Sequence, residues 1–503
     1  MTQLQNLGLG SWPRRRAALS PDHVAIEFEE TSRTYAQLAD RVEKLSGWLA
    51  DSGVRAGDRV AYWGGNHPAL LETLFAATRL GAVAVLINAR LTGTEAEFIL
   101  RDSGATALFF GREQAEDVLE AAEHVGVELL VDVDNSGRAR DYSGTSSPNE
   151  VAEVNSGLDD PAVILYTSGT TGRPKGAVLT HGNILFNDIN VLIENDIRPD
   201  EVCLAAAPLF HIAGLNGLVL PTFLKGGTIV VHRNVEAERI LAEVQNRGIT
   251  SMFAVPAMLD ALSAHSSFDG TDLSTLRTIV VGGAPVPART LQAWTERNVS
   301  VQQGYGLTET SPAVLKLSAE DGIRKVGSAG KPQFFVDVRL TASNGAPAAI
   351  GEVGEIQTVG PNVMHEYWQR PEATAEAFSG GWFRTGDAAV EDDDGYYWIR
   401  DRYKDMYVSG GENIYPAEVE SALMDIPGIV EAAVIGVSDD RWGEVGRAFI
   451  VLEGDAELEA ADVRTALGSS LSRFKIPKQI QVIDRLPRTT TGKLIKIELR
   501  ELI

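Results

Sequence analysis

The segment Tyr166-Thr-Ser-Gly-Thr-Thr-Gly-Arg-Pro-Lys-Gly176 decides the fold, because it combines a buried strand with a loop suited to anions. Ala162–Leu165 is apolar and predicts the strand, and residues 181–193 predict a helix after the loop. Positions 167–172 hold only glycine, serine and threonine, and Lys175 adds a positive charge. Glycines let backbone N–H groups converge on an anion, and hydroxyl groups add further donors. The stretch therefore predicts a phosphate-binding loop in an α/β protein.

Two common phosphate-binding motifs do not fit this loop. Pro174 precedes Lys175, at the position where a Walker loop requires glycine. The chain also contains no G-x-G-x-x-G sequence, which would indicate a dinucleotide-binding turn. A flexible surface linker would share the glycine and serine content, but its position directly after an apolar strand argues against it.

The rest of the chain predicts a large α/β domain followed by smaller parts. Residues 34–53 carry apolar side chains at helical spacing, and helices and strands alternate from there to about residue 310. The polar residues 137–149 predict a loop within this region. Residues 326–400 are rich in glycine and short strand-like runs and predict a β-rich subdomain. We expect layered α/β sheets in an N-terminal domain over residues 1–401 and a small α+β C-terminal domain over residues 402–503.

The composition limits the possible partners and compartments. The 503 residues are enough for about two to four domains. The formal net charge of −24 argues against nucleic acid or an anionic membrane as the main partner, because both require a basic surface. Cys203 is the single cysteine, so no intrachain disulfide forms, as is typical of a reducing compartment. No apolar run approaches the ~20 residues of a membrane helix, and we expect a cytoplasmic protein without an integral membrane segment.

Seven further motifs follow in chain order across the whole sequence. Together with the loop, they resemble the signature motifs of the adenylate-forming superfamily, which includes acyl-CoA synthetases, adenylation domains of nonribosomal peptide synthetases and luciferases. The resemblance implies the fold of that superfamily, with a mobile C-terminal domain that closes over the site. The motifs are Pro208-Leu-Phe-His-Ile212, Gly282-Gly-Ala-Pro285, Gln303-Gly-Tyr-Gly-Leu-Thr-Glu-Thr310, Trp382-Phe-Arg-Thr-Gly-Asp387, Asp401-Arg-Tyr-Lys-Asp405, Ser409-Gly-Gly-Glu-Asn-Ile-Tyr-Pro416 and Pro487-Arg-Thr-Thr-Thr-Gly-Lys493.

The resemblance implies a site for ATP and Mg²⁺. Tyr305 is expected to stack on the adenine, and Asp387 to accept hydrogen bonds from the ribose hydroxyls, supported by Arg402. Glu309 and Thr167 are expected to hold Mg²⁺, a hard cation that prefers oxygen ligands. The expected ATP or AMP ligands are Thr167, Ser168, Gly169, Thr170, Thr171, Gly172, Lys175, Gly283, Ala284, Pro285, Gln303, Gly304, Tyr305, Gly306, Thr308, Asp387 and Arg402.

The resemblance also implies catalytic and conformational roles. Lys493 is expected to reach the reacting carboxylate and the α-phosphate when the C-terminal domain closes. Lys404 is the expected hinge, about which that domain rotates, and Gly410 and Gly411 are expected to border the channel of the coenzyme A thiol. The two glycines also suit a tight turn. The expected catalytic residues are Lys493, Glu309, Thr167, Lys175 and His211.

The residues expected to line the acyl pocket are mostly small or apolar, and they suggest the class of acid. Residues 208–221 contain no acidic side chain to hold a substrate ammonium and no arginine to hold a second carboxylate. This argues against α-amino acids and against dicarboxylates such as malonate. The sequence as a whole resembles those of bacterial feruloyl-CoA synthetases, and medium- and long-chain fatty acyl-CoA synthetases are the next alternative. The expected pocket residues are His211, Ala213, Gly214, Gly217, Gly306 and Pro312.

Taken together, these motifs predict an acid–CoA ligase that uses ATP, Mg²⁺ and CoA and acts on an aromatic acid such as ferulate. A ligase that loads the thiol of a carrier protein stays open, as does a non-catalytic nucleotide sensor. Lys175, Glu309, Asp387 and Lys493 supply the charges that the chemistry needs, and they favour an enzyme. The histidines show no metal-ligand spacing, so we expect no zinc site. The oligomeric state is open, with a homodimer as one option.

Overall fold

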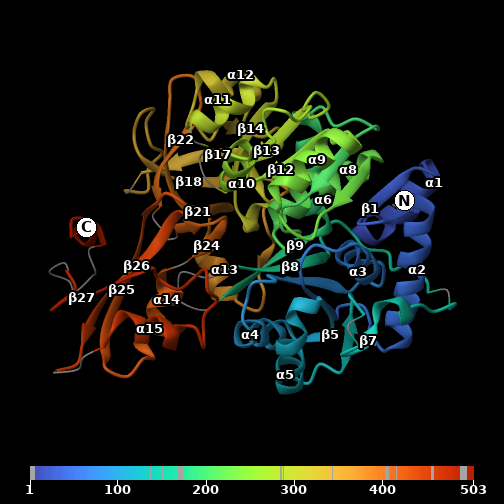
Figure 1. Cartoon of the computed structure of the whole chain (residues 1–503), viewed down its shortest axis with the longest axis horizontal. Helices are drawn as coiled ribbons and strands as arrows, with labels where there is room; N and C mark the ends of the chain where they lie inside the picture. Colours follow the sequence, from blue (N-terminus) through green and yellow to red (C-terminus); the bar gives the residue numbers. More distant parts are fainter. Residues whose placement is uncertain are drawn as a thin grey trace. The chain divides into compact units, whose positions relative to one another are not determined.

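Figure 1 shows a computed structural model of the chain. It describes residues 6–135, 137–149, 151–167, 174–283, 286, 288–342, 344–402, 407–414, 416–454, 458–487 and 496–502, with the backbone alone at 288, 400–402, 413, 417 and 497. The chain divides into two compact units. The first comprises Met1–Ala89, Glu97–Tyr166 and Gly176–Asp401, and the second comprises Arg90–Ala96, Thr167–Lys175 and Arg402–Ile503.

One layer of the first unit is an eight-stranded sheet with the order β19-β9-β8-β4-β3-β5-β6-β7. Neighbouring strands from β8 to β7 are parallel, whereas β19 is antiparallel to β9. Helix α3 (Pro68–Arg79) follows β3, and helix α5 (Ala115–Val125) follows β5. The strands are β3 (Arg59–Trp63), β4 (Val83–Ile87), β5 (Ala105–Phe110), β6 (Leu129–Asp132), β7 (Arg140–Asp141), β8 (Pro161–Thr167), β9 (Lys175–Thr180) and β19 (Glu366–Tyr367).

A second, nine-stranded sheet has the order β16-β15-β14-β13-β12-β10-β11-β1-β2. Its central strands are parallel, and β2, β15 and β16 pair antiparallel at its two edges. The strands are β1 (Val24–Phe28), β2 (Thr31–Thr34), β10 (Val202–Ala205), β11 (Thr228–Val231), β12 (Ser251–Ala254), β13 (Thr278–Val281), β14 (Ser300–Gly306), β15 (Ala313–Leu317) and β16 (Lys331–Pro332).

Helices cover these two sheets, and the core continues between them. Every residue of α3 is buried, because helices and strands pack around the whole of its surface. Its Phe75 ring lies 4.8 Å from the ring of Phe223 in helix α8. One hydrophobic cluster includes residues from both sheets. The further helices are α1 (Trp12–Leu19), α2 (Tyr35–Asp51), α4 (Gly93–Ser103), α6 (His181–Glu194), α7 (Ile212–Gly214), α8 (Leu220–Lys225), α9 (Ala237–Arg247), α10 (Pro256–Ser263), α11 (Ala288–Glu296), α12 (Ala319–Arg324) and α13 (Pro371–Ala377).

The β-rich region and the second unit complete the fold. The β-rich region is a five-stranded sheet in which β17, β18, β21 and β20 pair antiparallel and β22 pairs with β21. Its strands are β17 (Asp337–Thr341), β18 (Gly354–Val359), β20 (Phe378–Ser379), β21 (Trp382–Glu391) and β22 (Tyr397–Arg402). The second unit contains β23 (Tyr407–Ser409), β24 (Glu412–Ile414), β25 (Ile429–Asp439), β26 (Gly443–Leu452), β27 (Gln479–Val482), α14 (Pro416–Met424), α15 (Ala460–Leu467) and α16 (Lys496–Arg500). These layered sheets confirm the predicted fold class.

The structure also corrects one expectation and extends another. Residues 137–149 are not simply a polar loop, because they contain β7 and a short turn in which Tyr142 is 6 % exposed. The guanidinium of Arg41 stacks on the Tyr142 ring at 4.3 Å, which explains the burial. Between the glycine-rich loop and α6 the structure adds strand β9. Among the described residues, no helix is both long and apolar enough to cross a membrane.

Candidate active site

The glycine-rich loop joins two neighbouring strands, because β8 ends at Thr167 and β9 begins at Lys175. The Thr167 hydroxyl donates a long hydrogen bond of 3.5 Å to the Lys175 carbonyl. Before the loop, the Tyr166 hydroxyl donates to Asp102 Oδ2 at 2.8 Å, and Asp102 also forms an ion pair with Arg370. These contacts fix the end of β8. The predicted ligands Ser168, Gly169, Thr170, Thr171 and Gly172 lie outside the described residues.

The residues predicted for adenine and ribose lie side by side. The Tyr305 hydroxyl donates to Asp387 Oδ2 at 2.7 Å, joining the end of β14 to β21 of the β-rich sheet. Asp387 is 8 % exposed, and its backbone N–H donates to Thr385 Oγ1 at 3.1 Å. Gln303 bonds to neighbouring backbone, since its Oε1 accepts from Val286 N at 3.1 Å. Tyr305 and Asp387 belong to two motifs about 80 positions apart in the sequence, and the fold brings them together.

The end of β14 is a close-packed turn. A Cβ atom at Gly306 would overlap the carbonyl of Pro312, so glycine alone fits there. Ser311 adopts the left-handed conformation with φ of 67°, which non-glycine residues rarely do outside sites fixed by their surroundings. Of the remaining predicted ligands, Gly304 lies within β14 opposite Lys316, and Gly283 follows β13 with a φ of 89°.

Glu309 is held in place by residues that the sequence analysis did not identify. It lies in a short 3₁₀ turn over Thr308–Thr310 and is 7 % exposed. The hydroxyl of Tyr367 donates to Glu309 Oε1 at 2.7 Å. The backbone N–H of Met364 donates to the Glu309 carbonyl at 2.7 Å. No motif marks Tyr367 or Met364, and only the folded chain brings β19 and its preceding loop to this turn.

The predicted acyl segment is built around small residues. His211 is the N-cap of α7, and its ring lies 4.8 Å from that of Phe210. A Cβ at Gly214 would overlap the Pro208 carbonyl, and a Cβ at Gly217 would press on Phe253. Gly217 belongs to a π-helical turn, Leu215–Val219, a feature that is frequent at functional sites. Ala213 is half-buried in α7, and Pro312 lies in the turn after β14.

Asn66 was missed by sequence reasoning, although it fixes the start of this segment. Its Nδ2 donates to the carbonyls of Ala205 and Ala207 at 3.2 and 3.0 Å, and its Oδ1 accepts from Leu209 N at 2.8 Å. Asn66 is 3 % exposed and follows β3, so it connects the first sheet to the residues that precede His211. A lone asparagine in a turn gives no signal of this in sequence.

Most of the remaining predicted residues belong to the second unit. Gly410 and Gly411 form the two-residue turn of the β23–β24 hairpin, with φ of 58° and 85°. The Gly410 N–H donates to the Trp442 carbonyl at 2.9 Å. Arg402 ends β22 with its backbone alone described. Lys404 and Lys493 lie outside the described residues, as do Ala284 and Pro285.

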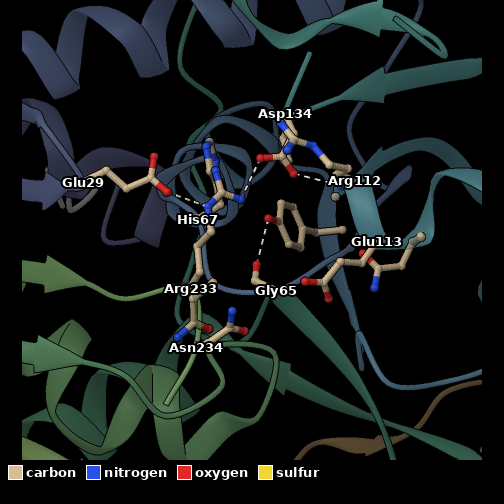
Figure 2. Close-up of a pocket in the computed structure, with 13 residues that line it drawn as sticks. Glu29, Gly65, His67, Arg112, Glu113, Asp134, Arg233 and Asn234 are labelled. Atoms are coloured by element: carbon tan, nitrogen blue, oxygen red, sulfur yellow. Dashed lines mark hydrogen bonds and ion pairs between the residues drawn. The ribbon is translucent and has the colours of Figure 1, made fainter. Parts of the chain in front are cut away.

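A polar cavity of about 300 Å³ lies elsewhere in the first unit (Figure 2). The cavity lies at the ends of β3 and β5, which are neighbours in the sheet. The chain leaves β3 toward β4 on one side and leaves β5 toward β6 on the other, and ligands commonly bind at such a point in α/β folds. Figure 2 shows the guanidinium of Arg233 between the carboxylates of Glu29 and Asp134. The nitrogen–oxygen distances of these two ion pairs are 2.7 Å to Glu29 and 2.6 Å to Asp134. Burial lowers the pKa of His67 to about 4, so its imidazole is neutral. None of the predicted site residues lines this cavity.

Comparison with known proteins gives consistent findings. The AMP-binding enzyme model matches residues 13–368, and the AMP-binding enzyme C-terminal domain model matches residues 418–493. A feruloyl-CoA synthase of Amycolatopsis sp is 48 % identical over 497 residues, which is 99 % of both chains. A long-chain-fatty-acid–CoA ligase of Mycobacterium tuberculosis is 36 % identical over 98 % of both chains. The o-succinylbenzoate CoA synthetase of Bacillus subtilis, solved with a product analogue, is 34 % identical with a TM-score of 0.89 over 98 % of both chains.

Proposed function

The chain belongs to the AMP-binding enzyme family, and on this premise we propose that it is an ATP-dependent, AMP-forming acid–CoA ligase. In the first half-reaction, a carboxylate oxygen attacks the α-phosphorus of ATP, pyrophosphate leaves and an acyl-adenylate forms. In the second, the thiol of CoA attacks the acyl carbonyl, AMP leaves, and the thiol proton passes to solvent.

The contact between Tyr305 and Asp387 carries this proposal. A buried carboxylate that a tyrosine hydroxyl orients can accept hydrogen bonds from the two ribose hydroxyls, while the tyrosine ring offers a face to the adenine. Glu309 lies three residues beyond Gly306 at the same end of β14. Tyr305 and Asp387 are therefore candidate partners for the nucleoside, and Glu309 is a candidate ligand for an ion on the phosphates. All three lie in the first unit, near the end of β14.

Mg²⁺ fits the donor set at Glu309. Mg²⁺ is usually held by one or two carboxylates together with substrate phosphates, rather than by a cage made of protein. Within the described residues, no group of three or more His, Cys, Asp or Glu side chains could hold a metal ion, and Glu309 is a single buried carboxylate oriented by Tyr367. Glu309 and Thr167 would hold the ion, which would neutralise charge on the triphosphate.

The protein's own groups would supply the remaining catalysis. A carboxylate and a triphosphate repel one another, so attack requires alignment and positive charge. Lys175 and the loop hydroxyls would bind the β- and γ-phosphates, and Lys493 would bind the reacting carboxylate oxygen and the α-phosphate. Rotation about Lys404 would then replace Lys493 with the turn at Gly410 and Gly411, beside which the thiol arm would enter.

We propose ferulate or a related hydroxycinnamate as the acid. The 48 % identity to a feruloyl-CoA synthase over nearly the full length supports this choice. The absence of acidic side chains and of arginine from residues 208–221 also suits an uncharged aromatic or aliphatic group on the acid. A fatty acid is the second candidate, supported by the 36 % identical fatty-acid–CoA ligase. ATP and CoA are cytoplasmic metabolites, and we expect the protein to act there.

A single mass-spectrometric assay tests the proposal. The purified protein is incubated with MgATP, CoA and a pool of ferulate, coumarate, cinnamate, benzoate, malonate and fatty acids of increasing length. Hydroxycinnamoyl-CoA with an equal amount of AMP is the expected result. Fatty acyl-CoA would replace the substrate proposal, and acyl-AMP without acyl-CoA would indicate a carrier-protein thiol. Nucleotide binding with no product from any acid would favour a sensor. Glu309→Gln is the matched inactive control.

A further inference from the structure

Helix α6 buries a face made of asparagines. Asn183, Asn187 and Asn190 are spaced by four and three residues, so they lie on one side of the helix. They are 7 %, 0 % and 0 % exposed. A buried amide side chain destabilises a protein unless it is hydrogen-bonded, so three on one face require a structural reason.

Two asparagines connect α6 to the loop that follows Glu309. Asn187 Oδ1 accepts from Ala313 N at 3.2 Å, and its Nδ2 donates to the Asn216 carbonyl at 2.8 Å. Asn216 Nδ2 in turn donates to the Ser311 carbonyl at 2.7 Å. Both side chains are fully buried, so water does not compete for these bonds.

A third asparagine, which follows the loop in the sequence, also bonds to it. Asn362 Nδ2 donates to the carbonyls of Thr310 and Ala313 at 2.8 and 2.7 Å, and it is fully buried. Two residues later, Met364 N donates to the Glu309 carbonyl. The carbonyls of residues 309, 310, 311 and 313 therefore all accept hydrogen bonds from outside their own turn, and this number of bonds can hold the left-handed residue between them.

We propose that Asn187, Asn216 and Asn362 are positioning residues that fix the loop carrying Glu309, and thereby the direction of its carboxylate. This inference rests on the proposed function, in which Glu309 holds Mg²⁺. The hydrogen bonds described above join the three asparagine side chains to the protein backbone and not to a proposed substrate-binding group. They act through the backbone on either side of Glu309, which leaves its carboxylate to Tyr367 and the ion.

Asn216 also belongs to the acyl segment. It lies in the π-helical turn Leu215–Val219, between Gly214 and Gly217, so one residue bonds to the Glu309 loop while its neighbours form the proposed acyl pocket. A shift of this turn on filling the pocket would be passed to the Ser311 carbonyl. The acid and the ion would thus be coupled through a single buried amide.

The test replaces each amide with leucine, which has a similar shape and no hydrogen-bonding group. The variants are Asn187→Leu, Asn216→Leu and Asn362→Leu. Asn190→Leu is the matched control, because Asn190 is equally buried on the same helix face but accepts from Phe335 N, outside the Glu309 loop. Melting temperatures place all four variants on one stability scale.

The first measurement is acid-dependent exchange of pyrophosphate into ATP at varied Mg²⁺. The loop variants are expected to lose at least tenfold in turnover and to need at least threefold more Mg²⁺ for half-maximal exchange. Asn190→Leu is expected to stay within twofold of the wild type on both measures at temperatures where it is folded. Loop variants with the Mg²⁺ curve of Asn190→Leu would overturn the positioning role.

Hydrogen exchange supplies a second measurement that does not depend on activity. The amides of residues 308–311 and 313 are expected to exchange at least tenfold faster in the loop variants than in Asn190→Leu, without ligand. Equal protection in all four would overturn the inference even if activity fell. A wild type that exchanges no pyrophosphate with any acid would disprove the proposed function instead, and the hydrogen exchange would still decide whether these amides fix the loop.

Discussion

At the scale of single residues, the Tyr305 hydroxyl and the Asp387 carboxylate have separable roles. In the proposed site, Tyr305→Phe keeps the ring for the adenine but removes the hydrogen bond that orients Asp387, so KM for ATP should rise about fivefold, which corresponds to about 1 kcal/mol of binding free energy. Asp387→Ala removes the charged acceptor that we propose for the ribose, worth about 3 kcal/mol, so kcat/KM for ATP should fall about 100-fold. Pyrophosphate exchange at varied ATP measures both.

The control for this pair is Tyr397→Phe. Tyr397 lies in the same β-rich sheet, and its hydroxyl donates to Glu391 Oε2 at 3.3 Å, away from Asp387. Its removal should leave KM for ATP unchanged. Equal effects of Tyr305→Phe and Asp387→Ala would mean that the hydroxyl alone holds the carboxylate in place. No effect of Asp387→Ala would remove it from the ribose site.

At the scale of elements, α6 contains a group that the asparagine face does not use. Asp188 is fully buried, and among the described residues neither carboxylate oxygen has a hydrogen-bond partner. Burial raises the pKa of Asp188 well above its ordinary value. The folded state therefore favours the protonated acid, and stability falls as the pH rises above the pKa of about 4 that the group has in the unfolded chain.

Asp188→Asn should remove this pH-dependent cost. We expect the variant to be more stable than the wild type by about 1–3 kcal/mol at pH 7.5, with a smaller gain at pH 5. Melting curves at the two pH values measure the difference. A variant that melts below the wild type at pH 7.5 would show that the carboxylate has a stabilising partner.

The sequence predicts those elements whose residues interact with near neighbours in the chain, and it misses those that depend on distant residues. Helix α2 begins after Thr34 as its apolar spacing predicts, with a capping box between Thr34 and Gln37. Strand β9 escapes prediction because its apolar run, Ala177–Leu179, is short and follows a glycine-rich loop. Tyr142 escapes because its partner, Arg41, is 101 positions away in the chain.

The candidate site divides in the same way. The motifs predict Tyr305, Glu309 and Asp387, because their residue types and order resemble those of a family. The buried asparagines of α6 carry no such signal, since asparagine is most common at turns and caps. Their burial follows from tertiary packing against loops about 30 to 180 positions distant in the chain, which local periodicity does not register.

At the scale of the whole molecule, three histidines contribute to a loss of stability at acid pH. Burial lowers the pKa values of His67, His181 and His232 to about 4 each. Their neutral forms are favoured by folding, so this stability is complete above pH 6.5 and is lost as the pH falls from 6.5 toward 4. The slope is at most about 1.4 kcal/mol per pH unit for each histidine.

His67→Asn tests this sign. Asparagine keeps an acceptor for the N–H of Ala69 at the start of α3 and does not titrate. The variant should lose less melting temperature than the wild type between pH 7.5 and 5.5. His124→Asn is the control, because His124 is exposed and its hydrogen bond with Glu97 raises its pKa. A larger loss in His67→Asn than in the wild type would contradict the prediction.

The second prediction at this scale concerns the two half-reactions. Lys493→Ala should abolish adenylate formation and spare thioester formation from supplied acyl-AMP, because in the proposed mechanism the lysine serves only the closed arrangement. Separate assays of pyrophosphate exchange and of CoA acylation measure the two steps. Equal loss in both would disprove this division. Lys404→Pro, which would stiffen the backbone of the proposed hinge, is expected to show the reverse pattern.

The position of Asn216 has a consequence for protein engineering. A library that varies residues 213–217 to admit new acids also varies the amide that supports the Glu309 loop. Selection for a wider substrate range would then discard variants whose pocket is suitable but whose loop has loosened. Holding Asn216 and the close-packed Gly214 constant while diversifying Ala213 and Gly217 separates substrate choice from catalytic speed, and should raise the share of active clones.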